Sequence, residues 1–233
     1  PKIKVIIPAF NEQDSIANVI QDIPSLVEEV IVVSNNSTDL TEVNAKHAGA
    51  TVLTENNKGY GYACLKGMDY IASTSLIDSS QKPDIIVFLD GDYSDYPEEL
   101  TKIIAPIIED NIDLVIGSRV KELREDGAMT PQQIFGNWLA TKLMSLFFKA
   151  KFTDLGPFRA IKYEKLLALN MVDKTYGWTV EMQLKALKQK LSYTEVPVNY
   201  RNIIGVSKVS GTIKGSIFAG IKILSWIFKY SFK

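Results

Sequence analysis

Short apolar runs alternate with helix-like segments along the first half of the chain, and this order constrains the fold more than any other feature. Each apolar run predicts a strand, at Lys4–Pro8, Glu29–Val33, Ala50–Thr54, Asp84–Leu89 and Leu114–Gly117. The segments between them predict helices, at Ser15–Ile23, in a stretch that ends at Ala48, at Gly61–Ser73 and at Glu98–Glu109. Strands and helices that alternate at this spacing favour the α/β class, with a parallel sheet covered by helices on both faces.

The pattern changes from about Lys121, where a charged loop begins. The elements expected after it are a helix at Gln132–Phe148, a turn with the letters DLGPFRA, helices at Tyr163–Leu169 and Thr179–Lys190, a strand at Tyr193–Val198 and an apolar helix at Ser216–Tyr230. We therefore expect one domain over residues 1–211, followed by an interfacial helix over residues 212–233.

Composition and charge exclude several classes of protein. The chain has 233 residues, of which 46% are apolar and 23% charged, as in globular proteins. Its formal net charge of -1 gives no reason to expect a nucleic-acid partner. The single cysteine, Cys64, rules out an intrachain disulfide. The single histidine, His47, has no ligand-type neighbours in sequence, so we expect neither a histidine-centred site nor a zinc site.

Two features bear on where the protein works. The chain opens directly on the first predicted strand, so we expect no signal peptide. No uninterrupted apolar run reaches the roughly 18 residues of a membrane-spanning helix. These features predict a cytoplasmic protein.

The strongest local signal for chemistry is Asp90-Gly91-Asp92, directly after the apolar run DIIVFL. In parallel sheets ligands bind beyond the carboxyl ends of the strands. Two carboxylates at a strand end offer oxygen ligands to Mg²⁺ or Mn²⁺ and leave coordination sites open for a diphosphate. The alternative is a solvated acidic turn, because two aspartates at this spacing often occur by chance.

Two other loops follow predicted strands. Residues 8–12, with the sequence PAFNE, precede a helix and are also suited to capping it. Residues 57–62, with the sequence NKGYGY, carry two glycines that can admit a nucleotide close to the backbone. Each loop is weak evidence by itself.

Taken in order, the motifs are far more specific. The chain carries P-A-F-N-E, S-N-N-S-T-D, N-K-G-Y-G, D-G-D, G-S-R, D-L-G-P-F-R and G-W-T-V-E. This series resembles the family 2 glycosyltransferases, and among them the polyprenyl-phosphate glycosyltransferases of the dolichyl-phosphate mannose synthase type. The resemblance covers roughly residues 3 to 210. It implies the Rossmann-like GT-A fold, with a mixed, mainly parallel sheet flanked by helices, and metal-dependent inverting sugar transfer.

The resemblance also implies which residues bind a nucleotide-sugar donor. They are Pro8, Ala9, Asn11, Glu12, Asn35, Asp39, Lys58, Gly59, Asp90, Gly91, Arg119, Arg159, Arg201, Ser207 and Lys208. Asp90 and Asp92 match the family's metal motif, with Asp92 the more direct ligand of Mg²⁺ or Mn²⁺. Asp39 would lie at the ribose or base.

Cations in this set would lie near phosphates. Arg119, in GSR, and Arg159, in GPFR, match positions where the family places positive charge. Arg201, Ser207 and Lys208 resemble a late segment that closes over the donor diphosphate or the acceptor phosphate. An arginine suits this position because its fork of donors can bind two phosphate oxygens at once.

The second-strand loop departs from the family pattern. The family usually has D-D-G-S-T-D where this chain has Ser34-Asn35-Asn36-Ser37-Thr38-Asp39. The amide of Asn35 can both accept and donate at a base edge, so base preference is open between uridine and guanosine. Asn36 stands where glycine is usual, and asparagine tolerates a left-handed backbone better than most residues do.

The acceptor decides whether a general base is needed. A sugar hydroxyl must lose its proton as it attacks, which requires a carboxylate within hydrogen-bond reach. A phosphate monoester, with a second pKa of about 6, is already largely ionised at neutral pH. Asp154 and Glu181 are the candidates for a catalytic or positioning role, and their structural alternatives are a turn-stabilising aspartate and a helix N-terminal glutamate.

The last segment of the chain bears on the acceptor. Lys214, Lys222, Ser225, Lys229 and Lys233 recur at helical intervals, and nearly all other residues there are apolar. Such a helix suits a membrane interface, with lysines near anionic headgroups. We therefore expect a peripheral enzyme at the inner face of the membrane that acts on a polyprenyl phosphate. The alternative is that this helix packs on the domain or forms a homo-oligomer contact.

Three other functions stay open from the sequence. The first is a glycosyltransferase of the same fold that acts on a hydroxyl of a glycan or small molecule. The second is a nucleotidyltransferase, although the loop after the first strand lacks the expected glycine-rich basic sequence. The third is a non-catalytic nucleotide-sugar binder, against which the set of Asp90, Asp92, Arg159 and Lys208 speaks.

Overall fold

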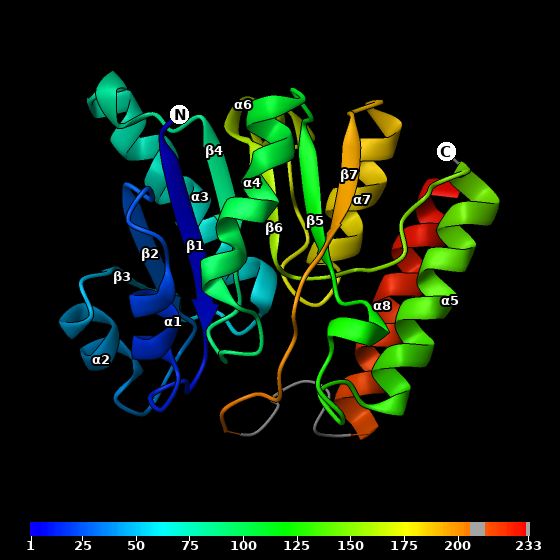
Figure 1. The fold of residues 1–233 in the computed structure, drawn as a ribbon, viewed down its shortest axis with the longest axis horizontal. Helices are drawn as coiled ribbons and strands as arrows, with labels where there is room; N and C mark the ends of the chain where they lie inside the picture. Colours follow the sequence, from blue (N-terminus) through cyan, green and yellow to red (C-terminus); the bar gives the residue numbers. More distant parts are fainter. Residues whose placement is uncertain (206–212, 232–233) are drawn as a thin grey trace.

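The computed structural model describes residues 1–205 and 213–231 and contains one sheet of seven strands (Figure 1). Along the sheet the strand order is β3-β2-β1-β4-β6-β5-β7. The strands are β1 (Ile3–Ala9), β2 (Glu29–Ser34), β3 (Thr51–Thr54), β4 (Ile85–Phe88), β5 (Leu114–Ser118), β6 (Arg159–Lys162) and β7 (Tyr193–Pro197). The sheet is mainly parallel, because β6 alone among these strands runs antiparallel, to both β4 and β5.

Helices and short 3₁₀ turns connect the strands. The helices are α1 (Ile16–Asp22), α2 (Thr41–His47), α3 (Tyr60–Ile77), α4 (Leu100–Glu109), α5 (Pro131–Phe148), α6 (Tyr163–Leu169), α7 (Trp178–Lys188) and α8 (Ile213–Ser231). The predicted α/β class is confirmed, and the predicted helices and strands match these elements to within a few residues. Among the helices that the structure describes, none qualifies as a bilayer-spanning segment.

Strand β6 was not predicted, because the letters DLGPFRA indicate a turn. The structure has a turn there, but the chain then continues into four residues that pair with β4 and β5. The strand begins with Arg159, a charged residue that is fully buried. A buried charge at a strand end hides the apolar pattern by which such a strand is normally recognised.

Each face of the sheet carries its own apolar core. In β1 all residues are buried, and successive side chains enter opposite cores. Ile7 packs in the core that α1 and α4 cover, whereas Ile6 packs in the core that α3 and α7 cover. This continuous apolar pattern is typical of a strand with helices on both faces.

Helix α8 lies beside α5 at the end of the sheet near β7 (Figure 1). It also contacts α7, and its Trp226 and Ile227 are buried in the core that α3 and α7 cover. The predicted closing helix is therefore present, with one side packed on the domain. The division of the chain into a domain and a separate interfacial helix stays a prediction.

The start of α3 packs unusually closely on the segment before α7. A Cβ added at Gly61 would overlap the backbone carbonyl of Asp173, whereas a Cβ added at Gly136, in α5, would meet nothing within 4 Å. Backbone cannot move aside as the end of a flexible side chain can, so the close contact depends on glycine at position 61.

We expect Gly61→Ala to lower the free energy of unfolding by about 1–3 kcal/mol, the usual cost of overpacking. Its matched control, Gly136→Ala, is expected to be neutral or to stabilise by up to about 1 kcal/mol, because alanine favours a helix more than glycine does. Denaturant unfolding of both variants measures the difference. Equal effects at the two positions would show that the close contact at Gly61 is not required.

Candidate active site

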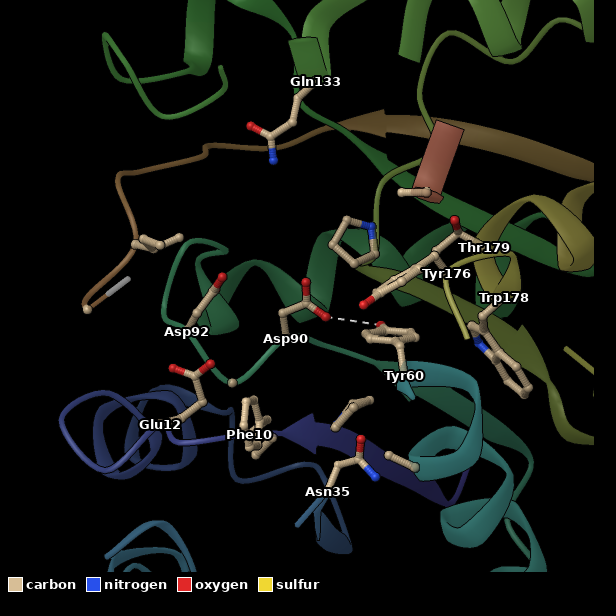
Figure 2. A pocket seen from close by; sticks show the side chains of 18 of the residues that line it. Phe10, Glu12, Asn35, Tyr60, Asp90, Asp92, Gln133, Tyr176, Trp178 and Thr179 are labelled. Atoms are coloured by element: carbon tan, nitrogen blue, oxygen red, sulfur yellow. Dashed lines mark hydrogen bonds between the residues drawn. The ribbon is translucent and has the colours of Figure 1, made fainter. Parts of the chain in front are cut away.

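A cavity of about 750 Å³ opens beyond the carboxyl ends of β1, β2 and β4 (Figure 2). The loops that follow these strands form one side of it, as expected for a sheet whose parallel strands end at a common edge. Ten residues of the predicted site line this cavity: Pro8, Ala9, Glu12, Asn35, Lys58, Gly59, Asp90, Gly91, Asp92 and Arg119. The structure thus brings together residues that lie more than 100 positions apart in the sequence.

Asp90 and Asp92 lie side by side at the acidic edge of this cavity (Figure 2). The Tyr60 hydroxyl donates a hydrogen bond to Oδ1 of Asp90 at 3.0 Å. Burial and the negative charge of Asp92 raise the pKa of Asp90 to about 7. Oδ1 of Asp92 accepts hydrogen bonds from the backbone N–H and the hydroxyl of Ser94, which fix its direction.

Two further carboxyl groups lie near this edge. Glu12 points towards the two aspartates in Figure 2, and its Oε2 accepts a hydrogen bond from Ser15. Asp95 is 1% exposed, and neither of its carboxylate oxygens has a hydrogen-bond partner among the described residues. Burial, with the charges of Asp90 and Asp92, raises the pKa of Asp95 well above its usual range.

The carboxylates Asp90 and Asp92 suit a divalent cation. Within residues 1–205 and 213–231, no three His, Cys, Asp or Glu side chains form a complete metal cage. An ion such as Mg²⁺ is usually held by one or two carboxylates, with water and substrate phosphates completing its coordination. Asp90 and Asp92 match that arrangement, because both carboxylates line the open cavity.

Asn35 joins the second-strand loop to the loop after β3. Its amide nitrogen donates to the carbonyls of Glu55 at 3.2 Å and Asn57 at 2.6 Å, and its Oδ1 accepts from the Gly59 N–H at 2.8 Å. An aspartate could not make the first two hydrogen bonds, since a carboxylate has no donor. Both amide hydrogens are therefore used within the protein, and only the oxygen has capacity left for a base.

Asn36 has a φ of 63°, the left-handed backbone that the sequence predicted at this position. Asn11 and Asp39, predicted to bind the nucleotide, do not line the cavity. Oδ1 of Asn11 accepts from the Thr38 N–H at 2.8 Å, and the Asp39 carboxylate accepts from the N–H groups of Thr41 and Gln13. Both side chains hold the first two loops together.

The two predicted catalytic carboxylates are fully engaged. Asp154 is buried and accepts from the backbone N–H and the guanidinium of Arg119, at 2.6–3.0 Å. Glu181 is completely buried, accepts from the N–H groups of Val172 and Asp173, and pairs with Lys185 at 2.7 Å. Neither lines the main cavity, whereas Asp154 lines the second cavity described below, and the catalytic role of both residues stays a prediction.

Two arginines that were predicted to bind phosphates, Arg159 and Arg201, donate to backbone carbonyls in this structure. Arg159 is completely buried and donates to the carbonyls of Leu155, Gly156 and Thr179. Burial lowers the pKa of Arg159 to about 10. Neither Arg159 nor Arg201 lines the cavity, and their contacts with phosphates stay a prediction. In Arg159, backbone carbonyls in the core take the side-chain donors.

Arg201 instead holds the loop that follows Asp92. It donates to the carbonyls of Tyr93 and Asp95, and its guanidinium stacks 3.5 Å from the Tyr93 ring centre and 3.9 Å from that of Tyr96. The predicted contacts of Ser207 and Lys208 lie outside the described residues.

Several cavity residues were not predicted from the sequence. Tyr60, Tyr176, Thr179 and Gln133 all line the cavity (Figure 2). Tyr60 was within reach, since it stands inside the NKGYG motif. The others follow turns in the second half of the chain, where their position depends on how the helices pack and no local pattern indicates it.

A second cavity of about 680 Å³ lies between α5 and the segment after β5, and Arg119 lines both cavities. Its charged residues are Arg119, Lys121, Arg124, Lys142, Lys151, Glu122 and Asp154. Cations outnumber anions in this set, the reverse of the acidic edge. The exposed apolar side chains of Ile134 and Trp138 form part of its wall.

Comparison with known proteins identifies glycosyltransferases as relatives of this chain. The model of the family described as Glycosyl transferase family 2 matches residues 4–167. An uncharacterized glycosyltransferase of Mycobacterium tuberculosis is 32% identical over 93% of this chain and 94% of its own length. A UDP-N-acetylglucosamine–dolichyl-phosphate N-acetylglucosaminyltransferase of Methanococcus voltae is 28% identical over 84% of each chain.

Solved structures resemble the fold. Glucosyl-3-phosphoglycerate synthase from Mycobacterium tuberculosis, solved with Mn²⁺, UDP and phosphoglyceric acid, superposes with a TM-score of 0.75 at 21% identity. The match covers 99% of this chain and 78% of that one. This likeness confirms the predicted GT-A fold.

The raised pKa of Asp90 predicts how stability depends on pH. Asp90 has a pKa of about 7 when folded, above the value of about 3.9 in an unfolded chain. Between these values the folded state binds more protons, so the stability of the metal-free protein falls as pH rises from about 4 to about 7. Asp90→Asn should therefore raise the melting temperature of the metal-free protein at pH 8 and leave it unchanged at pH 5.

The asparagine oxygen can still accept the hydrogen bond from Tyr60. Asp69→Asn, at an exposed position within α3, controls for the loss of one negative charge. A metal-free Asp90→Asn variant that melts below the wild type at pH 8 would contradict this account of the acidic edge.

Proposed function

The chain belongs to glycosyl transferase family 2, and we propose that it transfers a sugar from a nucleotide-sugar donor to a polyprenyl phosphate at a membrane surface. Its activity as a glycosyltransferase follows from the family. The acceptor and the membrane are the parts proposed. The observation that carries the proposal is that both candidate base carboxylates are engaged within the protein, while a cationic cavity adjoins the donor site.

The donor diphosphate is assigned to the acidic edge of the main cavity. Asp90 and Asp92 would hold Mg²⁺ or Mn²⁺, and the structural relative described above contains Mn²⁺ and UDP. When bound, the ion neutralises negative charge that builds on the departing nucleoside diphosphate. Lys58 and the backbone at Gly59 face the same cavity and are suited to the remaining phosphate and ribose oxygens.

The acceptor is inferred from the contacts of the candidate base carboxylates. Asp154 holds Arg119 through two side-chain hydrogen bonds and one backbone hydrogen bond, so both of its oxygens are directed at this arginine. A phosphate monoester is largely ionised at neutral pH and needs only to be positioned. Arg119 lies at the boundary of the two cavities, where one guanidinium can face both the donor and an anionic acceptor.

The second cavity has the charge and surroundings for a lipid phosphate. Arg124, Lys142 and Lys151 add positive charge beside Arg119. Exposed apolar side chains also lie on α5 and on α8, the helix that contacts it. They are Phe135, Trp138, Leu146 and Phe147 on α5, and Ile217, Phe218, Ile221 and Phe228 on α8. Such a surface next to lysines suits a membrane interface.

The Methanococcus relative, whose name gives a dolichyl phosphate as acceptor, supports this proposal. A second candidate has its own support. The structural relative contains phosphoglyceric acid, and a small phosphorylated acceptor would also complement a cationic cavity. Both acceptors bring a phosphate, but only the lipid accounts for the apolar surface on α5 and α8.

The proposal is tested by offering UDP- and GDP-sugars with undecaprenyl phosphate in anionic vesicles, with Mg²⁺, Mn²⁺ or EDTA. We expect a glycolipid product that depends on the metal, and we expect the protein to sediment with the vesicles. Phosphoglyceric acid and unphosphorylated glycans serve as the competing acceptors. Metal-dependent transfer to one of these, with no glycolipid, would contradict the lipid acceptor.

A further inference from the structure

The segment from Asp173 to Gly177 lies between the C-terminal helix and the donor cavity. Asp173 is 3% exposed, and its Oδ2 accepts a hydrogen bond from the indole N–H of Trp226 at 2.6 Å. The ammonium group of Lys222 lies 3.2 Å from the same oxygen. Both donors come from α8, so one buried carboxylate oxygen binds this helix through two of its side chains.

The other oxygen of Asp173 shapes the turn that leads into the cavity. Oδ1 accepts from the backbone N–H groups of Thr175 at 2.8 Å and Gly177 at 3.0 Å. Within and after this turn, Tyr176 and Trp178 line the cavity. A Cβ at Gly177 would meet both the Asp173 carboxylate and the Trp226 ring, so the turn is packed directly against α8.

The same segment also holds the start of α3. The N–H groups of Gly61 and Tyr62 donate to the carbonyls of Thr175 and Lys174, at 3.3 and 3.1 Å. A Cβ at Gly59 would overlap the carbonyl of Lys174. Gly59 lines the donor cavity, and the neighbouring Tyr60 donates to Asp90. A continuous series of contacts thus runs from α8 to the acidic edge.

We propose that Asp173 is a positioning residue. Through it, the packing of α8 against the segment before α7 determines the affinity of the donor site for a nucleotide. A buried carboxylate is stabilised by its donors, and hydrogen bonds that involve a charged group are stronger than neutral ones. If α8 is displaced, Oδ2 loses both of its donors from this helix. The turn at residues 175–177 then also loses the packing of Gly177 against Trp226, and its movement would change the cavity wall and the start of α3.

The outer face of α8 is open to a binding partner, whereas its inner face reaches the donor cavity. Ile217, Phe218 and Ile221 are exposed, whereas Ala219 lines the donor cavity. A membrane or protein that binds the exposed face of α8 therefore binds the same helix that contacts Asp173. The inference rests on the proposed function only in that the main cavity is taken as the donor site.

The test is the affinity of UDP and GDP in the presence of Mn²⁺, measured by calorimetry on the full chain. Trp226→Phe removes the indole N–H and keeps an aromatic ring in the core. We expect its dissociation constant for the better nucleotide to rise roughly five-fold or more, within the usual range of coupling between sites. The matched control, Tyr230→Phe, removes a hydroxyl one turn further along α8 from a residue that lines neither cavity, and it should bind like the wild type.

A second variant guards against a general loss of folding. Lys222→Ala removes the other donor to Asp173 from a half-exposed position and should weaken binding in the same direction, with little change in melting temperature. Trp226→Phe and Lys222→Ala variants that bind nucleotide like the wild type would overturn the inference, whatever their melting temperatures. A wild type that binds neither nucleotide would instead overturn the donor site itself, and the inference with it.

Discussion

Negative charge gathered at one edge of the sheet is the constraint on which the rest of the structure depends. Parallel strands end at a common edge, and the loops after β1 and β4 bring Glu12, Asp90, Asp92 and Asp95 to it. Burial of so many carboxylates costs stability, as the raised pKa of Asp90 indicates. The fold accepts this cost at the position where a divalent ion and a diphosphate would relieve it.

The cations of the chain are distributed in a complementary way. Arg159 and Arg201 use their donors on backbone carbonyls, so they hold loops in place and add no positive charge to the lining of the donor cavity. Arg119 is held by Asp154 at the boundary between the acidic edge and the cationic second cavity. Under the proposed function, a metal ion would balance the carboxylates of the donor side, and the acceptor side would have its own positive charge.

The sequence predicted the fold and the acidic edge because both depend on local patterns. Asp90 and Asp92 follow an apolar strand directly, and the family motifs occur in a fixed order. The roles of Glu181 and Arg159 could not be predicted, since their burial is decided by packing between distant segments. Strand β6 was missed for the same reason. The contact of Asp173 with α8 joins residues 53 positions apart, and no local sequence pattern indicates it.

The most direct measurement is the affinity of the wild-type protein for UDP and GDP at pH 7.5, titrated with Mn²⁺ and again with EDTA. The account predicts that one nucleotide binds at least about ten-fold more tightly with the metal, a difference of about 1.4 kcal/mol. Partial proton release on metal binding should accompany the tighter complex, because the fraction of Asp90 that its raised pKa leaves protonated must ionise. Equal affinity with Mn²⁺ and with EDTA would contradict the claim that the acidic edge is a metal-dependent donor site.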